Sequence, residues 1–349
     1  VSGGAFASVE LLRVVDDKCQ ALFDNCFKVL DGPDAPDMTI RELDKKVIIY
    51  LTNKKSSNNY LEGYIEKDPS IVVGDPYFRF EGYQIFQLAN SQVSVESIYD
   101  VAKARLVAQY DIKNGVGKLV NFNADEKIGY EVPQVMVEGG DAGVEHSFVV
   151  TEDLFATGDR NLVNHKQYYY MVVAYAYNNF KTYDPSDPNP PVGQKKPYLA
   201  GRRNIQVYTA MPHQIVNGDI VSSEYNDVPS MTRIEGQGNG GNFLVMDQAS
   251  VDNVLAKGPL QDGVSLGDPN YPIVYQPTYE KGYSPLTIKV VDPLKVKNGK
   301  YNVRFTDGTA NNNLITKARW ELTDLSTGEV YKSDTTISVD NDQLILDLG

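Results

Sequence analysis

The segment from Leu162 to Asn178 constrains the fold more than any other part of the chain, because from Tyr168 to Tyr177 it is an unbroken run of apolar and aromatic residues that fall into two alternating sets. One alternating set is Tyr168, Tyr170, Val172, Ala174 and Ala176, and the other is Tyr169, Met171, Val173, Tyr175 and Tyr177. A period of two with aromatic and β-branched residues is typical of a β-strand. Since neither face is polar, we predict a central strand of a sheet that is covered on both sides.

The length and charge of the chain limit its class. A chain of 349 residues predicts two or three domains, and 42% hydrophobic with 23% charged residues is an ordinary globular composition. The formal net charge of −13 argues against a nucleic-acid partner, because a phosphate-binding surface needs clustered Lys and Arg. Solubility alone explains the acidic balance, with cation binding as the alternative. No run approaches the ~18 apolar residues of a membrane-spanning helix.

The ends of the chain indicate an excised segment. No basic region followed by an apolar core is present at Val1, so no signal peptide is recognisable. Because the chain begins without Met and ends on QLILDLG, which is typical of a strand, we expect an internal segment of a larger precursor. The missing signal peptide then carries no information about the compartment.

Residues 8–30 have the pattern of a helix. Ser8 is suited to cap its start, and Gly32 with Pro33 to end it. The apolar face is formed by Leu12, Val15, Cys19, Leu22 and Cys26. In a continuous helix the two cysteines lie ~10.5 Å apart along the axis, too far for a disulfide. Two buried free thiols and a disulfide across a broken helix both stay open.

The fold class predicted is mainly β, a tandem β-sandwich with one N-terminal helix. Residues 1–33 form the helical tail of an upstream domain, 34–212 a sandwich with insertions, and 213–349 a second sandwich that is loop-rich at its start. Strands are expected at 38–42, 46–52, 77–88 (irregular at Gly82), 105–110, 146–151 and 203–210. In the last part they are expected at 286–292, 300–307, 317–324, 328–334, 336–340 and 343–349, with a short helix at 249–256. The polar, proline-rich segment 178–201 is expected to project as a loop.

The central strand resembles the penultimate strand of fibronectin type III domains. That family has Leu, a turn with Gly, Tyr six residues after the Leu, and then alternating aliphatic residues that end in Ala. The matching residues are Leu162, Tyr168, Tyr170, Val172 and Ala174, and His165 replaces the turn glycine. Asn164 beside it tolerates left-handed backbone and is expected to take over the turn. The Asp34-Ala35-Pro36 entry and the KVIIYLT strand also resemble the start of such a domain, and Tyr83–Leu88 takes the place of its third strand. The resemblance covers about residues 34–212 and implies a fibronectin type III-like sandwich.

Three longer phrases are similar to large secreted surface proteins of the Bacteroidota type, which the type IX secretion system exports. They are ALFDNCFKVLDGPDAPD, YYYMVVAYAYN with its DPNPPVG loop, and WELTDLSTGEV. The resemblance implies an extracellular, cell-surface location and the secretion machinery as a partner during export. It implies no catalytic residues.

Sequence motifs give little support to catalysis or metal chemistry. Gly236, Gly238 and Gly241 match G-x-G-x-x-G, but a dinucleotide site needs this motif between a strand and a helix, and a strand is expected directly after it. The three histidines, His146, His165 and His213, lack metal-ligand spacing. Paired carboxylates could support glycoside hydrolysis, but acidic residues are too abundant for such pairs to be informative. We therefore predict no catalytic residues and no enzyme activity for this segment.

Aspartates in turns are the candidate ligands for calcium. Asp31, Asp34 and Asp37 follow one another at intervals of three, Asp184 and Asp187 lie in the expected projecting loop, and Asp340 and Asp342 lie near the end of the chain. Calcium takes 6–8 oxygen ligands from carboxylates and carbonyls on loops. No complete calcium-binding loop motif is present, and Asp also occurs in turns for its own hydrogen bonding.

Tyrosine is unusually frequent, with 23 residues against one Trp. Aromatic residues gather where the central strand enters the projecting loop, at Tyr175, Tyr177, Phe180 and Tyr183. The strand tyrosines are expected to fill the core, which leaves Phe180 and Tyr183 exposed as candidate contacts with protein or glycan.

These observations predict a non-catalytic extracellular structural or interaction module of a larger surface protein: a spacer, an adhesin segment or a surface-assembly subunit. Its partners would be other surface proteins or copies of itself. The alternative is an accessory or glycan-binding region of a secreted hydrolase whose catalytic domain lies outside this segment.

Overall fold

The computed structural model describes residues 16, 30–124, 131–184, 193–215, 223–236, 243–306, 309–311, 314–316, 318–338 and 342–349. The chain is mainly β, as predicted, and its strands form several antiparallel sheets. It divides into two compact units, one of residues 1–215 with 299–344 and one of residues 216–298 with 345–349. Of the helix expected at 8–30, the structure describes only Asp16, which is helical, and Leu30, which is not; both cysteines lie outside the described residues.

One sheet of the first unit has three strands in the order β1-β2-β8. They are β1 (Asp37–Leu43), β2 (Lys46–Thr52) and β8 (Ser147–Val150). The tight β1–β2 turn at Asp44 and Lys45 fixes their pairing, with Leu43 opposite Lys46. The run KVIIYLT is buried along almost its whole length because β2 is the central strand.

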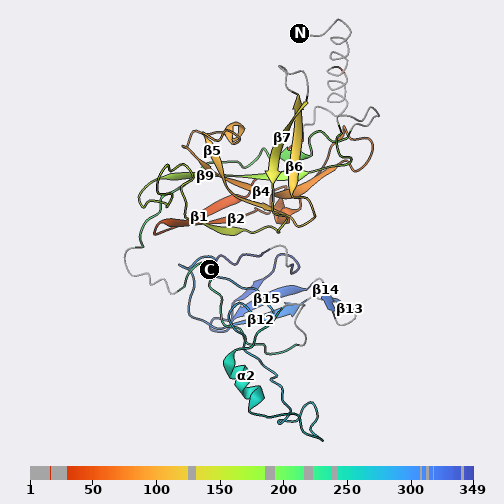
Figure 1. Ribbon diagram of the computed structural model, residues 1–349, viewed down its shortest axis with the longest axis vertical. Coiled ribbons are helices and arrows are strands. Elements are labelled where there is room, and N and C mark those ends of the chain that lie inside the picture. The colour runs from red at the N-terminus through yellow and green to blue at the C-terminus, as the bar shows by residue number, and fades with distance from the viewer. Residues whose placement is uncertain are drawn as a thin grey trace. The chain divides into compact units, whose positions relative to one another are not determined.

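The second sheet of this unit is built around β4 (Tyr77–Leu88) and β9 (Tyr168–Tyr177), which pair antiparallel along almost their full length. Two short strands, β10 (Tyr198–Ala200) and β11 (Tyr208–Ala210), pair with the far side of β9. On the far side of β4 lie β3 (Ile65–Lys67) and β5 (Ala104–Asp111). Figure 1 shows β1 and β2 in one layer and β4 and β9 in the next.

The main core lies between these two sheets. Val47, Ile49 and Leu51 of β2 pack with Val172 and Ala174 of β9, all of them almost fully buried. Burying a side chain of this kind stabilises a fold by about 1.5–3 kcal/mol. Strict alternation in β2 and β9 therefore places one face of each strand in a shared core.

The opposite face of β9 is covered as well, which confirms the predicted central strand. Met171 and Val173 pack with Phe86, Leu88 and the loop that carries η2 (Val95–Ser97). Tyr175 packs with residues of the hairpin formed by β6 (Lys118–Ala124) and β7 (Glu131–Glu138). This hairpin stands on the side of β4 and β9 that faces away from β1 and β2 (Figure 1).

The turn into β9 is held by a bond between main chain and side chain. The Val163 N–H donates to the Tyr168 hydroxyl over 2.9 Å, and Leu162 is fully buried beneath the turn. His165 has a φ of +63°, so the prediction that Asn164 would take the left-handed conformation is wrong. The Asn164 side chain instead accepts from Lys45 N over 2.8 Å and donates to Asp44 over 2.6 Å. The Asn164 side chain therefore joins two turns, and its neighbour His165 adopts the left-handed backbone conformation.

The segment 178–201 is not entirely a projecting loop, because its end forms β10. Of the strand expected at 203–210, only β11 at its C-terminal end is present. Both strands pair with β9. The segment between them contacts the loop before β1: Ala35 N donates to the Arg203 carbonyl over 3.0 Å, and the Asn204 side chain donates to the Ala35 carbonyl over 2.8 Å.

The later strands form a separate three-stranded sheet in the order β12-β15-β16. They are β12 (Tyr301–Thr306), β15 (Arg319–Asp324) and β16 (Val330–Lys332), and β13 (Thr309–Asn311) pairs with β14 (Leu314–Thr316). These strands confirm three of the expected segments. No strand forms at 286–292 or 343–349, although both are described, and α2 (Gln248–Leu255) confirms the expected short helix.

Candidate functional site

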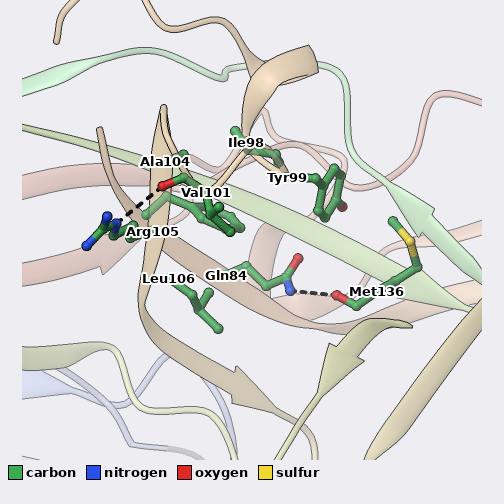
Figure 2. Close-up of a pocket in the computed structure, with 9 residues that line it drawn as sticks. Gln84, Ile98, Tyr99, Val101, Ala104, Arg105, Leu106 and Met136 are labelled. Atoms are coloured by element: carbon green, nitrogen blue, oxygen red, sulfur yellow. Dashed lines mark hydrogen bonds between the residues drawn. The ribbon is translucent and has the colours of Figure 1, made fainter. Parts of the chain in front are cut away.

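A concave site of about 420 Å³ lies over the edge of the second sheet. We call it the β5 groove and define it by its lining residues: Gln84, Phe86, Ile98, Tyr99, Val101, Ala104, Arg105, Leu106 and Met136. Figure 2 shows Ile98, Tyr99 and Val101 above Gln84, with Leu106 to its left and Met136 to its right. Eight of the nine side chains carry no charge, and three of the wall residues are substantially exposed: Tyr99, Val101 and Leu106.

A chain of hydrogen bonds fixes the polar side chains of the groove. The Tyr99 hydroxyl donates to that of Tyr198 over 2.9 Å, and Tyr198 donates to Gln84 Oε1 over 3.1 Å. Gln84 Nε2 donates to the Met136 carbonyl and to Gln109 Oε1, over 2.9 and 3.0 Å. Burial holds the pKa of Tyr198 well above its usual value, so this phenol stays protonated. The chain joins the η2 loop, β10, β4 and β7 into one rigid wall.

Among the described residues, Arg105 is the only charged one that lines the groove, and it is directed to the protein itself. Arg105 Nε donates to the Val101 carbonyl over 3.2 Å, and its Nη1 donates to the Leu154 carbonyl. The guanidinium also lies 4.6 Å from the centre of the Phe155 ring. These contacts order the rim, and the interior of the groove is apolar.

A second cluster surrounds His146, at the start of β8. Its Nδ1 lies 2.5 Å from Asp342 Oδ1 and its Nε2 lies 3.0 Å from Glu62 Oε1. The same Glu62 oxygen accepts from the Tyr83 hydroxyl over 2.9 Å. Asn53 donates to both Tyr83 and Glu62. The two partners of the imidazole, Glu62 and Asp342, come from positions far apart in the chain.

The two carboxylates set the charge of His146. Burial of the imidazole lowers its pKa, but the hydrogen bonds to Asp342 and Glu62 outweigh this and raise the pKa to about 9. His146 is therefore a buried cation at neutral pH. Glu62 reaches it from a turn in which both Leu61 and Glu62 have φ near +55°, a conformation that costs about 1–2 kcal/mol per residue. An imidazolium with both nitrogens on carboxylates is suited to hold segments together rather than to act as a base.

A third polar cluster lies at the bulge of β4. Burial, and repulsion from Asp111 and Asp141, raise the pKa of Glu81 to about 7, against a lowering by the hydrogen bond from Asn114. Asp141 N donates to Asp111 Oδ1 over 3.0 Å, and Asn114 N donates to Asp141 Oδ1 over 2.7 Å. The Asp111 and Asp141 carboxylates each accept a main-chain N–H from a loop, so the cluster joins the β5–β6 and β7–β8 connections.

The aspartates predicted to bind calcium are held by other partners. Asp31 pairs with Arg203 at 2.6 Å, Asp34 accepts from Asn58 N over 3.1 Å, and Asp37 pairs with Lys54 at 2.9 Å. In the part of the chain that the structure describes, no three His, Cys, Asp or Glu side chains are arranged to hold a metal ion. Asp184 is exposed and Asp187 lies outside the described residues, so calcium binding in their loop stays a prediction.

Phe180 and Tyr183 are less exposed than expected. Phe180 packs against the main core and against Gly74. The Tyr183 ring lies 4.8 Å from that of Phe122, centre to centre, and its hydroxyl donates to Glu131. Both side chains thus fasten the segment after β9 to the body of the sandwich, and their role as ligand contacts stays a prediction.

The groove and the His146 cluster were both missed by reasoning from the sequence. Glu62 and Asp342 lie 84 and 196 positions from His146, so no local spacing connects them. The groove residues belong to an insertion, 89–103, and to three strands whose pairing only the fold reveals. The insertion carries several apolar residues, but the sequence does not show that Tyr99 and Val101 are exposed while Val93 and Ile98 are buried.

Comparisons with protein-family models, with curated proteins and with solved structures found no match to this chain. Among the described residues, no helix has the length and apolar character needed to cross a membrane.

Proposed function

We propose that the chain is a non-catalytic structural and interaction module of a larger extracellular surface protein, built on a fibronectin type III-like sandwich. The observation that carries the proposal is the corner at the start of β9, where the Val163 N–H donates to the Tyr168 hydroxyl over 2.9 Å. A tyrosine at the start of the penultimate strand, bonded to the main chain a few residues upstream, is a hallmark of immunoglobulin-like sandwiches.

The strand order supports the same proposal. Three strands, β1-β2-β8, face a sheet in which β9 lies between β4 and the last strands, β10 and β11. Tyr83–Leu88, the segment that the resemblance assigns to the third strand, is the part of β4 paired with both β5 and β9. Sandwiches of this kind serve many proteins as spacers and recognition modules, so function is assigned to surfaces and not to the fold.

The polar clusters favour a structural module over the accessory region of a hydrolase. His146 is held as a cation between carboxylates, and the acidic side chains near Glu81 cap loops. Phe180 and Tyr183, the residues that a glycan-binding loop would present, are packed against the body of the sandwich.

Surface exposure on producing cells tests the proposal. Intact cells that make the full-length precursor would be treated with protease, and peptides from this chain would be measured in the supernatant. Release from intact cells is the expected result, and protection until the cells are lysed would overturn the extracellular assignment. A screen of the precursor for glycoside, ester and peptide hydrolysis tests the non-catalytic role. Hydrolysis that Glu62→Gln or Glu81→Gln abolishes would contradict that role.

A further inference from the structure

The interaction surface of this module can be located at the β5 groove. Resting on the proposed function, we propose that the groove binds an extended, apolar segment of another polypeptide, which pairs with β5 as an added strand. The proposal depends on the open edge of β5, on the wall of the groove and on its charge.

The edge of β5 is open where it borders the groove. Ala89 N bonds to the Lys103 carbonyl at one end of the β4–β5 pairing, and Ile112 N to the Glu81 carbonyl at the other. Hydrogen-bonded and non-hydrogen-bonded pairs alternate in an antiparallel ladder, so the main-chain groups of Leu106 and Gln109 point away from β4. Among the described residues, this outer edge is paired only at the Asp111–Gly143 bridge.

The wall of the groove presents apolar side chains beside that edge. Val101 is 74% exposed, and Tyr99 and Leu106 are also exposed, at 41% and 45%. In Figure 2 Val101 lies beside Ala104 at the start of β5, and Leu106 follows on the same strand. A strand added to β5 would direct every second side chain toward this wall. The occupant that matches is an extended segment with apolar residues at alternate positions.

The charge and hydrogen bonding of the groove favour such a segment from another protein. No carboxylate lines it, although the chain carries a net charge of −13, and its one cation is held by the Val101 and Leu154 carbonyls. Lys or Glu side chains of a ligand would find no counterion there. A second copy would bring a further −13 charges to the contact.

Peptide selection on the intact 349-residue protein tests the proposal. A library of random seven-residue peptides displayed on phage would be selected against it, and the enriched sequences would be synthesised. We expect apolar residues at alternate positions and few charges. Bound peptide is expected to slow hydrogen exchange of the Leu106 and Gln109 amides, whereas the Ala108 and Tyr110 amides, which face β4, change little.

Variants of the wall separate groove binding from other sites. Val101→Glu is expected to weaken peptide binding at least tenfold. Val72→Glu is the matched control, because Val72 is 89% exposed on a loop that does not line the groove, and it should bind as the wild type does. Circular dichroism would confirm that both variants fold.

Several results would overturn the proposal: no enriched peptide, equal binding by Val101→Glu, or slowed exchange only at amides outside β5. A wild-type dimer in sedimentation equilibrium that Val101→Glu dissociates would assign the groove to a second copy and also overturn it. None of these results affects protease accessibility on intact cells, so failure here is distinct from failure of the proposed function.

Discussion

The main-chain N–H of Val163 donates a hydrogen bond to the side-chain hydroxyl of Tyr168, over 2.9 Å, and closes the turn into β9. Tyr168 is almost fully buried, so its ring anchors the turn to the core while its hydroxyl fixes the main chain. One residue thereby couples the loop before β9 to the strand that organises the sandwich.

Tyr168→Phe is expected to destabilise the sandwich by about 1 kcal/mol, because the Val163 N–H loses its partner while the packing of the ring is kept. Equilibrium unfolding in guanidinium chloride measures the change. Tyr169→Phe is the matched control, since the Tyr169 hydroxyl bonds only an exposed Gln167 side chain, over 3.1 Å. Equal losses for both variants would contradict the role of this corner.

His165→Gly is expected to stabilise the fold by about 0.5–1 kcal/mol. At a φ of +63° a non-glycine residue is strained by about 1–2 kcal/mol, part of which the greater entropy of Gly in the unfolded chain offsets. His165→Ala, which keeps the Cβ, serves as control and should give no gain. The His165 N–H donates to the Pro212 carbonyl over 2.8 Å, and this bond is retained in both variants.

The strands of the first unit could be predicted because their apolar residues repeat with the two-residue period of a β-strand. KVIIYLT and YYYMVVAYAY each give a strand with the predicted bounds, and Gly82 marks the predicted irregularity in β4. Prediction failed for QLILDLG, which has the composition of a strand but forms none. Composition favours a strand, yet a partner strand decides whether one forms.

The candidate sites depend on contacts between distant parts of the chain and were not predictable. Gln84 lies within a run of buried strand residues, and nothing local indicates that it bonds Gln109, Met136 and Tyr198. The left-handed backbone conformation was predicted for Asn164 but belongs to His165, because only the conformational preference of Asn was considered. The structure shows that Asn164 is engaged by the turn between β1 and β2, a contact across 119 positions.

Gly82→Ala is expected to destabilise the sandwich by about 3 kcal/mol. A Cβ at Gly82 would lie 2.1 Å from the Tyr110 carbonyl oxygen and 2.6 Å from the Tyr175 hydroxyl, inside a strand that is paired on both sides. Gly158→Ala is the matched control, because a Cβ there meets no atom within 4 Å. Thermal unfolding of the two variants measures the difference, and a Gly82→Ala protein as stable as the control would contradict the packing described.

Glu81 is expected to make the protein less stable as pH rises from about 4.5 to 7. Burial raises its folded-state pKa to about 7 from the usual 4.5, so the fold prefers the protonated carboxyl. Its stabilisation is complete below pH 4.5 and is lost as the pH rises to 7, a change on the order of 3 kcal/mol. Glu81→Gln keeps an oxygen acceptor for Asn114 and should remove this dependence. An unchanged slope of stability against pH in that variant would contradict the assignment.

His146 is expected to make the protein less stable as pH rises from about 6.5 to 9, a range above that of Glu81. Because the folded-state pKa is raised to about 9 from 6.5, the stabilisation by the imidazolium is complete below pH 6.5 and is lost as pH rises through 9. The loss should be on the order of 2 kcal/mol, since Asp342 is only partly shielded from solvent.

Asp342→Asn tests this directly, because it removes the carboxylate 2.5 Å from His146 Nδ1 while keeping an oxygen acceptor. We expect the His146 pKa, followed by NMR of the imidazole ring, to fall by about one unit or more, since each unit corresponds to 1.36 kcal/mol of lost charge interaction. Asp334→Asn, a surface change away from the cluster, is the control. With three histidines in the chain, a His146→Gln spectrum identifies the signal. If the His146 pKa stays near 9 in Asp342→Asn, Glu62 alone raises it. That result would contradict the contribution of Asp342.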